Sequence, residues 1–396
     1  MMRPASRVKV SGIKADWKHP TEIRFGVERV NELPEVCWKL GVCSPLLVTD
    51  KGVARLNFIR RIVEFNAGDS IDTAIFSEIS GEPDAETVTR GAAVFRKGGY
   101  DGIIAVGGGS ALDAGKAMAL TTAVGPTKLW QFAATACDPP RPARPIPPII
   151  ALPTTAGTGS EVDANAVITD RSGTRKVSLY HPELLPRVVI ADPTLIRGLI
   201  PYLTASTGMD ALSHNLEALS SPVFQPILDA IAMQGIGFIK EWLPVAVTQP
   251  RNLHARVYTM AASIMGAMAF EKGLGAMHAI AHAVGGAFKI HHGRVVGAVM
   301  PYVLKENRRA IKGKMEQLAR NLDLPHHDFN AVLDWVIDLR HDLGMPTSLG
   351  ALGIRAKHVP FLADHALQDV NMSTNPVEMG KQKMERVLHR AVQGKL

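Results

Sequence analysis

The sequence predicts two domains: an α/β domain with a parallel sheet over residues 1–196, and an all-α domain over residues 197–396. Three observations lead to this fold class. A chain of 396 residues is too long for one ordinary hydrophobic core. In the first half, short apolar runs alternate with amphipathic stretches, which is typical of parallel strands joined by crossover helices. In the second half, apolar residues recur every three or four positions, which indicates helices.

The elements of the first half follow one another in a regular order. Apolar runs predict strands at 44–50, at 72–79, and at the starts of 101–124 and 145–161. Amphipathic stretches predict helices at 51–65, at 84–99 and in the second part of 101–124. Residues 175–195 are expected to be extended structure that closes the domain. We interpret the proline-rich segment 137–148 as a surface loop.

The composition favours a cytoplasmic enzyme. Hydrophobic residues make up 46% and charged residues 20%, as in soluble globular proteins. No uninterrupted apolar run reaches the ~18–20 residues that span a bilayer, and the first ten residues lack the apolar segment of a secretory signal. The net charge of +7 indicates either a basic surface or nucleic-acid binding. Because the basic clusters are short and mixed with other residues, we expect no nucleic-acid or membrane partner.

The three cysteines, Cys37, Cys43 and Cys137, form no CxxC motif, and their number is odd. This argues against a disulfide framework and against a thiolate metal cluster. A metal in this protein would therefore be held by nitrogen and oxygen atoms.

Two polar glycine turns follow apolar strands and predict a nucleotide site. In VGGGSALDAGK (106–116) the glycines allow close approach of a ligand, and the following helix offers free N–H groups to a phosphate. Ser110 is either the N-cap or a phosphate donor. The motif is neither GxGxxG nor a P-loop, so a plain strand-to-helix turn is the alternative. In PTTAGTGSE (153–161) threonine hydroxyls surround two glycines at the end of the next apolar strand, where open α/β sheets bind ligands.

Asp50 ends the first apolar strand. Its carboxylate could accept a hydrogen bond from the adenosine ribose and would repel a 2′-phosphate, which favours NAD over NADP. The alternative is a simple turn residue. We also expect Asp113 to contact the cofactor.

Histidines and one aspartate predict a metal site in the second half. Asp210 and His214 lie four residues apart on an expected helix, and His278 and His282 repeat this spacing in GLGAMHAIAHAVGGAFKIHHG (273–293). A single Asp or His in a helix is more often capped, hydrogen-bonded or solvated. Three histidines with a carboxylate would suit Fe²⁺ or Zn²⁺. The pattern alone leaves open which histidines bind.

These motifs, in this order, resemble those of the iron-containing (group III) alcohol dehydrogenases over nearly the whole chain. The resemblance implies an N-terminal dinucleotide-binding domain and a C-terminal helical domain, an architecture shared with dehydroquinate synthase. It implies NAD(P)-linked interconversion of small primary alcohols and aldehydes, and a homo-oligomer. A bound metal would lower the pKa of the alcohol, which then passes hydride to the nicotinamide.

Carried over by position, the resemblance assigns each site residue a role. The implied metal ligands are Asp210, His214, His278 and His292. The implied cofactor residues are Asp50, Gly108, Gly109, Ser110, Thr154, Thr155, Thr158 and Lys176. His282 falls near the substrate and is a candidate proton relay, with a packing histidine as the alternative. We expect His292 to follow a turn at Gly285–Gly286, and His291 to be structural or solvent-facing.

Two departures from the family pattern leave the substrate open. Ala283 stands where many relatives carry proline, and the segment 270–273 is one residue shorter than in some relatives. One alternative function is a dehydroquinate synthase-like lyase, which would need several Lys or Arg residues around its substrate. Glycerol dehydrogenases and maleylacetate reductases are alternatives among the oxidoreductases. A non-catalytic NAD- or metal-binding protein is the alternative outside enzymes.

Overall fold

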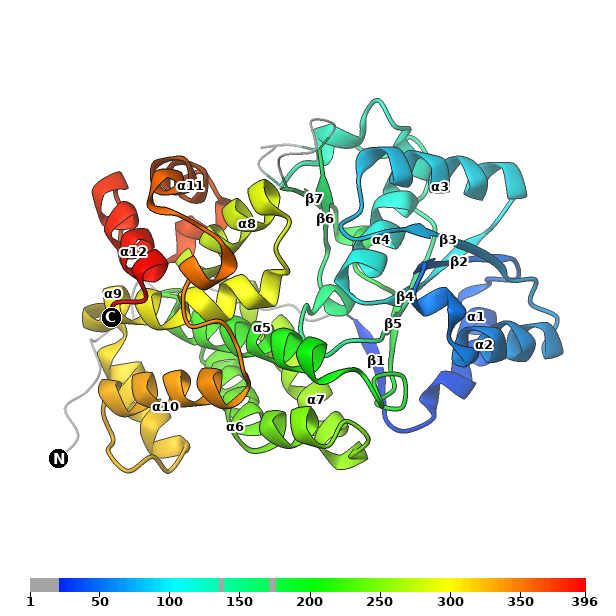
Figure 1. Ribbon diagram of the computed structural model, residues 1–396. Helices are drawn as coiled ribbons and strands as arrows, with labels where there is room; N and C mark the ends of the chain where they lie inside the picture. The colour runs from blue at the N-terminus through cyan, green and yellow to red at the C-terminus, as the bar shows by residue number, and fades with distance from the viewer. Residues whose placement is uncertain (1–20, 135–138, 171–175) are drawn as a thin grey trace, which may run out of the picture. The chain divides into compact units, whose positions relative to one another are not determined.

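The computed structural model describes residues 21–134, 139–170 and 176–396, so Cys137 lies outside the described residues. Contacts divide these residues into two compact units (Figure 1). The first unit comprises Thr21–Leu199 and Pro250–Met260, and the second comprises Ile200–Gln249 and Ala261–Leu396. The second domain expected from the sequence begins at residue 197 and includes Pro250–Met260, whereas the contacts of this segment join it to the first unit.

The first unit is built on a six-stranded sheet in which every pairing is parallel, in the order β1-β8-β5-β4-β2-β3. Its strands are β1 (Glu22–Phe25), β2 (Pro45–Asp50), β3 (Ala74–Ile79), β4 (Gly102–Gly107), β5 (Ile149–Pro153) and β8 (Val188–Ala191). An antiparallel hairpin adds β6 (Asn165–Thr169) and β7 (Lys176–Tyr180). β4 and β5 are buried at every residue, which explains their unbroken apolar sequences. The predicted parallel sheet is confirmed.

Helices cover both faces of this sheet. They are α1 (Leu33–Leu40), α2 (Asn57–Gly68), α3 (Ala85–Gly98) and α4 (Gly109–Val124). Alternate residues of a strand point to opposite faces. Ile104 and Val106 of β4 therefore pack in one cluster with residues of α1 and α2. Gly115 of α4 lies against Ile103 and Ala105 on the other face.

The described residues of the second unit form helices joined by turns and contain no strand, so the predicted helical domain is confirmed. Its helices are α5 (Pro201–Ser220), α6 (Pro226–Thr248), the end of α7 (Leu253–Ala269), α8 (Ala276–Phe288), α9 (His292–Asn321), α10 (Phe329–Asp342), α11 (Val359–Leu367) and α12 (Lys381–Gln393). Short 3₁₀ helices join them at Phe270–Lys272, Gly350–Leu352, Ala356–His358 and Val370–Thr374. The first unit has similar short helices at Arg29–Glu32, Val53–Arg55, Leu129–Phe132, Ser160–Val162 and Pro182–Leu184.

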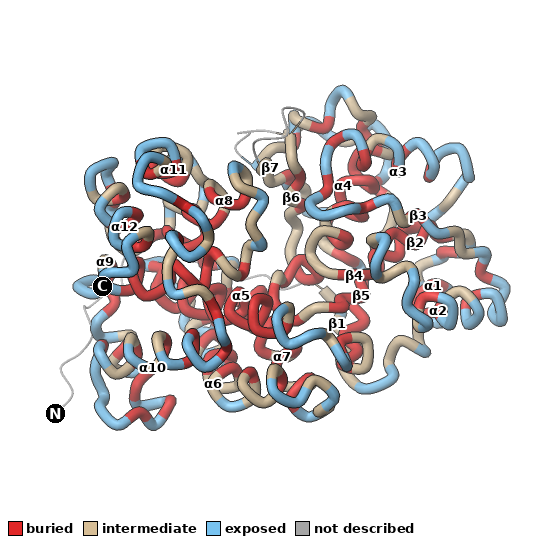
Figure 2. The backbone as a smooth tube through the Cα atoms, in the orientation of Figure 1, coloured by how far each residue is buried: buried red, intermediate tan, exposed pale blue. Residues whose placement is uncertain are grey.

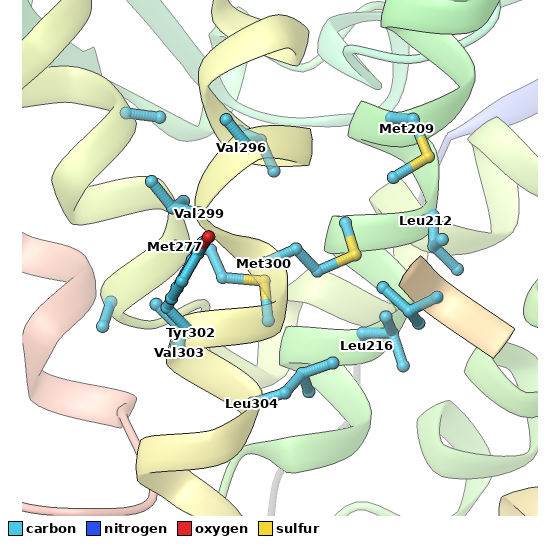
Figure 3. Packing of buried hydrophobic residues seen from close by; sticks show 14 of the residues in the cluster. Met209, Leu212, Leu216, Met277, Val296, Val299, Met300, Tyr302, Val303 and Leu304 are labelled. Carbon is cyan, nitrogen blue, oxygen red and sulfur yellow. The ribbon is translucent and has the colours of Figure 1, made fainter. Parts of the chain in front are cut away.

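Helix α5 lies at the centre of the second unit. Every residue from Thr204 to Ser220 is buried, and Figure 2 shows the helix as buried over most of its length. Figure 3 shows how Leu212 and Leu216 of α5 pack with Met277 of α8 and Met300 of α9. This shared core fixes α5, α8 and α9 against one another, and these three helices carry all the predicted metal ligands.

Among the described residues, one helix is long and apolar enough to cross a membrane by length and composition alone: α6, with a mean hydropathy of 1.2 over its best window. Its buried residues recur every three or four positions: Leu228, Ala232, Gly235, Ile236, Ile239, Leu243 and Ala246. This is the pattern of a helix that packs one face against protein. A single helix of this kind is weak evidence for a membrane span.

Candidate metal centre and cofactor site

Helix α5 presents Asp210 and His214 from its buried interior. The two residues are one helical turn apart, so their side chains lie on the same face. They are only 3% and 4% exposed. Burying a charged or polar side chain is costly unless a partner compensates, so both side chains need partners inside the core.

His278 of α8 completes a compact group with these two residues. Its ring stacks on that of His214, with ring centroids 4.7 Å apart and an angle of 16° between the planes. The potential ligand atoms of Asp210, His214 and His278 all lie within 4.8 Å of one another. The structure therefore brings together residues from helices that are more than sixty positions apart in sequence.

His292 is the first residue of α9 and lies beside this group. Its Nε2 is 3.4 Å from Oδ1 of Asp210, and its ring centroid is 5.4 Å from that of His278. The prediction of a turn at Gly285–Gly286 before it is wrong. Gly285–Gly286 lies inside α8, and the chain turns at Lys289, which has a left-handed φ of 53°. His291 is exposed, and its ring contacts that of Tyr202 edge-on.

His282 occupies the next turn of α8 after His278, and its ring lies next to that of His292 with centroids 5.4 Å apart. Its Nδ1 is 2.8 Å from Oδ2 of Asp369. Burial raises the pKa of Asp369, but the hydrogen bond to His282 outweighs this and the net pKa lies below its usual value. Asp369 was not found from the sequence, since it follows His282 by 87 residues without any shared motif.

The donor set fits a divalent metal ion. Nε2 of His278 is buried and has no hydrogen-bond partner among the described residues. Burial also lowers the pKa of His278 to about 3, so its ring is neutral, as a metal ligand must be. Three imidazoles and one carboxylate match the ligands that Fe²⁺ and Zn²⁺ take in proteins.

In the first unit, the predicted glycine turn joins β4 to α4. Gly107 has a φ of 151°, which side chains rarely adopt, and α4 begins at Gly109 with Gly108 as its N-cap. The alternative that Ser110 is the N-cap is therefore wrong: the helix starts one residue before it. The free N–H groups of this helix end are suited to a phosphate.

The second turn packs directly on the first. A Cβ atom at Gly108 would lie 3.3 Å from Thr155, and one at Gly109 would lie 2.9 Å from Thr158. Thr154 donates its backbone N–H to the carbonyl of Gly107 at 2.9 Å. The two predicted cofactor turns therefore form one surface at the carboxyl ends of neighbouring strands, because β4 pairs with β5.

Asp50 ends β2, next to β4 in the sheet. Its Oδ1 accepts hydrogen bonds from the backbone N–H groups of Gly52 at 2.8 Å and Val53 at 2.9 Å. Its Oδ2 would lie 3.6 Å from a Cβ atom at Gly107. Oδ1 of Asp50 is thus used by the turn at Gly52 and Val53, while Oδ2 faces the glycine turn between β4 and α4.

Asp113 and Lys176 make contacts inside the first unit. Asp113 accepts hydrogen bonds from the hydroxyl of Ser160 and, at 3.1 Å, from the backbone N–H of Val167, and burial raises its pKa to about 6. Lys176 of β7 forms an ion pair with Glu82, with 2.9 Å between Nζ and Oε1. Asp113 therefore ties α4 to the second turn.

Two family models match the sequence of this chain. A model described as "Iron-containing alcohol dehydrogenase" matches residues 20–193, and one described as "Fe-containing alcohol dehydrogenase family, C-terminal" matches residues 204–392. The chain belongs to the iron-containing alcohol dehydrogenase family. It is an oxidoreductase of the alcohol dehydrogenase type.

Individual relatives are similar over nearly their full length. The chain is 35% identical to a 4-hydroxybutyrate dehydrogenase of Cupriavidus necator, covering 94% of this chain and 98% of the relative. A 1,3-propanediol oxidoreductase structure matches with a TM-score of 0.89 and 34% identity, covering 95% of this chain and 99% of that one. A sulfoacetaldehyde reductase from Bifidobacterium kashiwanohense, solved with NAD⁺, matches with a TM-score of 0.87 and 31% identity over 96% and 99%. These relatives favour a dehydrogenase over the lyase alternative.

Proposed function

We propose that this enzyme interconverts a small primary alcohol and its aldehyde at a metal ion held by Asp210, His214, His278 and His292. The observation that carries the proposal is the convergence of the first three residues in the buried core, with ligand atoms within 4.8 Å of one another. His292 adds a third imidazole at the same carboxylate. A divalent ion held by these residues would polarise the substrate oxygen and lower the pKa of an alcohol.

His282 is the proposed proton relay. Asp369 accepts the hydrogen bond from Nδ1, so the proton of the neutral ring resides there and Nε2 is left as the acceptor. In alcohol oxidation this nitrogen would take up the proton that the substrate hydroxyl loses. His282→Ala should lower turnover while Zn²⁺ affinity stays unchanged. Full turnover across the pH range in this variant would contradict the relay.

The proposed cofactor residues lie along the carboxyl edge of the sheet. Gly108, Gly109 and Ser110 would hold the pyrophosphate at the start of α4, since the helix end offers N–H groups and a positive dipole. Asp50 would accept from the adenosine ribose through Oδ2 and exclude a 2′-phosphate. Further contacts are proposed for Asp113, Thr154, Thr155, Thr158 and Lys176.

The substrate identity is best found by direct assay. The relatives act on 4-hydroxybutyrate, 1,3-propanediol and sulfoacetaldehyde, which each carry a second polar group. The purified, metal-loaded enzyme should oxidise or reduce at least one compound of this kind with NAD(H). Failure with every alcohol and aldehyde in such a panel would contradict the proposed substrate class.

We further propose a cytoplasmic homo-oligomer without a membrane or nucleic-acid partner.

A further inference from the structure

Glu217 lies on the same face of α5 as the proposed ligands Asp210 and His214, three residues after His214. It is 4% exposed, and it reaches the N-terminus of α8. Its Oε1 accepts a hydrogen bond from the backbone N–H of Met277 at 2.7 Å. Its Oε2 lies 2.6 Å from Nδ1 of His278 and 3.4 Å from the backbone N–H of the same residue. One carboxylate therefore contacts both the main chain and the ring of His278.

The direction of the hydrogen bond between Glu217 and Nδ1 of His278 follows from the groups around the carboxylate and from its charge. The backbone N–H groups of Met277 and His278 can only donate, so the carboxylate oxygens accept. An ionised carboxylate has no proton to give, so with Glu217 ionised it is Nδ1 of His278, 2.6 Å from Oε2, that carries the ring proton. The lone pair is left on Nε2, which lies 3.8 Å from Oδ1 of Asp210. This is the tautomer in which Nε2 can bind a metal.

A second polar group supports the same helix end. Asn375 accepts from the backbone N–H of Ala276 at 3.2 Å and is itself paired with Asn307 of α9. A Cβ atom at Gly275 would lie 2.8 Å from Oδ1 of Asn375 and 2.9 Å from Oε1 of Glu217. Glycine at this position therefore leaves room for both acceptors at the first turn of α8.

We propose that Glu217 is a positioning residue: it fixes the tautomer and the orientation of His278 so that Nε2 is presented to the metal. The proposal rests on His278 being a metal ligand, as stated under the proposed function. The local order of α5 makes the arrangement possible, because Asp210, His214 and Glu217 recur at the spacing that places side chains on one helix face. Partners of this kind typically change metal affinity 10- to 100-fold when removed.

The test compares Glu217→Gln with the wild type. An amide has one acceptor and one donor group. If its NH₂ group faces His278, Nδ1 must accept, and the ring proton moves to Nε2. We expect Zn²⁺ affinity, measured by competition with a chromophoric chelator, to fall about 10- to 100-fold. Glu241→Gln, on the exposed side of α6, is the matched control and should bind Zn²⁺ as the wild type does.

Two further measurements separate the possible failures. Equal Zn²⁺ affinity of Glu217→Gln and wild type, with only a lower melting temperature of the apoprotein, would show a purely structural role and overturn the proposal. If His278→Ala binds Zn²⁺ normally, the ligand assignment itself is wrong. Should Glu217→Gln not fold, nitrogen NMR of ¹⁵N-histidine-labelled wild-type apoprotein decides. The signal that disappears in His278→Ala is assigned to His278. In the wild type this signal must report a proton on Nδ1, and a proton on Nε2 would overturn the proposal.

Discussion

The approach of α9 to α5 beside the metal ligands can be tested by adding one methyl group at Gly293, which follows His292. A Cβ atom at Gly293 would lie 2.0 Å from the backbone oxygen of Ser206. Ordinary van der Waals contact begins at 3.4 Å, so the helices would have to open by about 1.4 Å, the difference between these values. The backbone of a buried helix cannot turn aside as a flexible side chain can. Gly293→Ala must therefore move α9 away from α5 at this point.

The expected cost follows from that displacement. Overpacking of this kind destabilises a protein by about 1–3 kcal/mol, and each kcal/mol lowers the melting temperature by about 2–4 °C in a domain of 150–250 residues. The shift also affects the 3.4 Å separation between Nε2 of His292 and Oδ1 of Asp210. Metal sites tolerate about 0.2 Å of variation in ligand distance, so Zn²⁺ affinity should fall as well.

The same helix offers a matched control. Gly313 also lies within α9, but a Cβ atom there would have no neighbour within 4 Å. Gly313→Ala should therefore raise the stability, by up to about 1 kcal/mol from helix propensity alone. Thermal melting of the two variants with and without Zn²⁺ gives the comparison. If Gly293→Ala melts at or above the wild-type temperature and keeps its Zn²⁺ affinity, the close helix contact is refuted.

Three further predictions concern pH, cofactor choice and metal removal. Burial raises the pKa of Glu161 from 4.5 to about 7, so the folded protein keeps a proton that the unfolded chain releases between these values. The free energy of unfolding should therefore fall as pH rises through this window. Urea unfolding at pH 5 and pH 8 should show that Glu161→Gln removes about 3 kcal/mol of this fall. An equal fall in variant and wild type would contradict this. Asp50→Ala removes the carboxylate that would repel a 2′-phosphate. It should raise the ratio of kcat/KM for NADPH to that for NADH about tenfold, which corresponds to about 1.4 kcal/mol. An unchanged ratio would exclude a role of this carboxylate in cofactor choice. Removal of the metal by a chelator should abolish turnover. It should also lower the melting temperature, since a ligand at 100 times its Kd stabilises the folded state by about 2.7 kcal/mol. A metal-free enzyme that is active and equally stable would contradict a metal site.

Much of the fold follows from local sequence patterns. The unbroken apolar residues of β4 and β5 and the amphipathic pattern of α3 predict these elements close to their observed bounds. The helix predicted over 51–65 begins later, at Asn57, and ends at Gly68. The strand β1 was not predicted, because Glu22–Phe25 has only four residues and no apolar run. Gly285–Gly286 was expected to be a turn, and glycine does disfavour helices. In the structure Gly285 is buried in α8, where packing outweighs this preference.

The site could be predicted only in part, for a similar reason. Asp210 and His214 repeat at a helical spacing, so their shared face is visible in the sequence. Glu217 lies on the same face but was not predicted. Its only sequence signal is that it is an acidic residue among apolar neighbours, seven positions after Asp210. Asp369 has no local signal, since its role depends on the packing of α8 against the segment Val370–Thr374 that follows it.

The central claim is that one metal ion is bound by Asp210, His214, His278 and His292, and that His282 stands outside this set. Anomalous diffraction at the zinc edge, from crystals of the Zn²⁺-loaded enzyme, tests it most directly. We expect one strong peak about 2.0–2.2 Å from a nitrogen of each of the three histidines and from an oxygen of Asp210. A peak bonded to His282, or one away from α5, would contradict it.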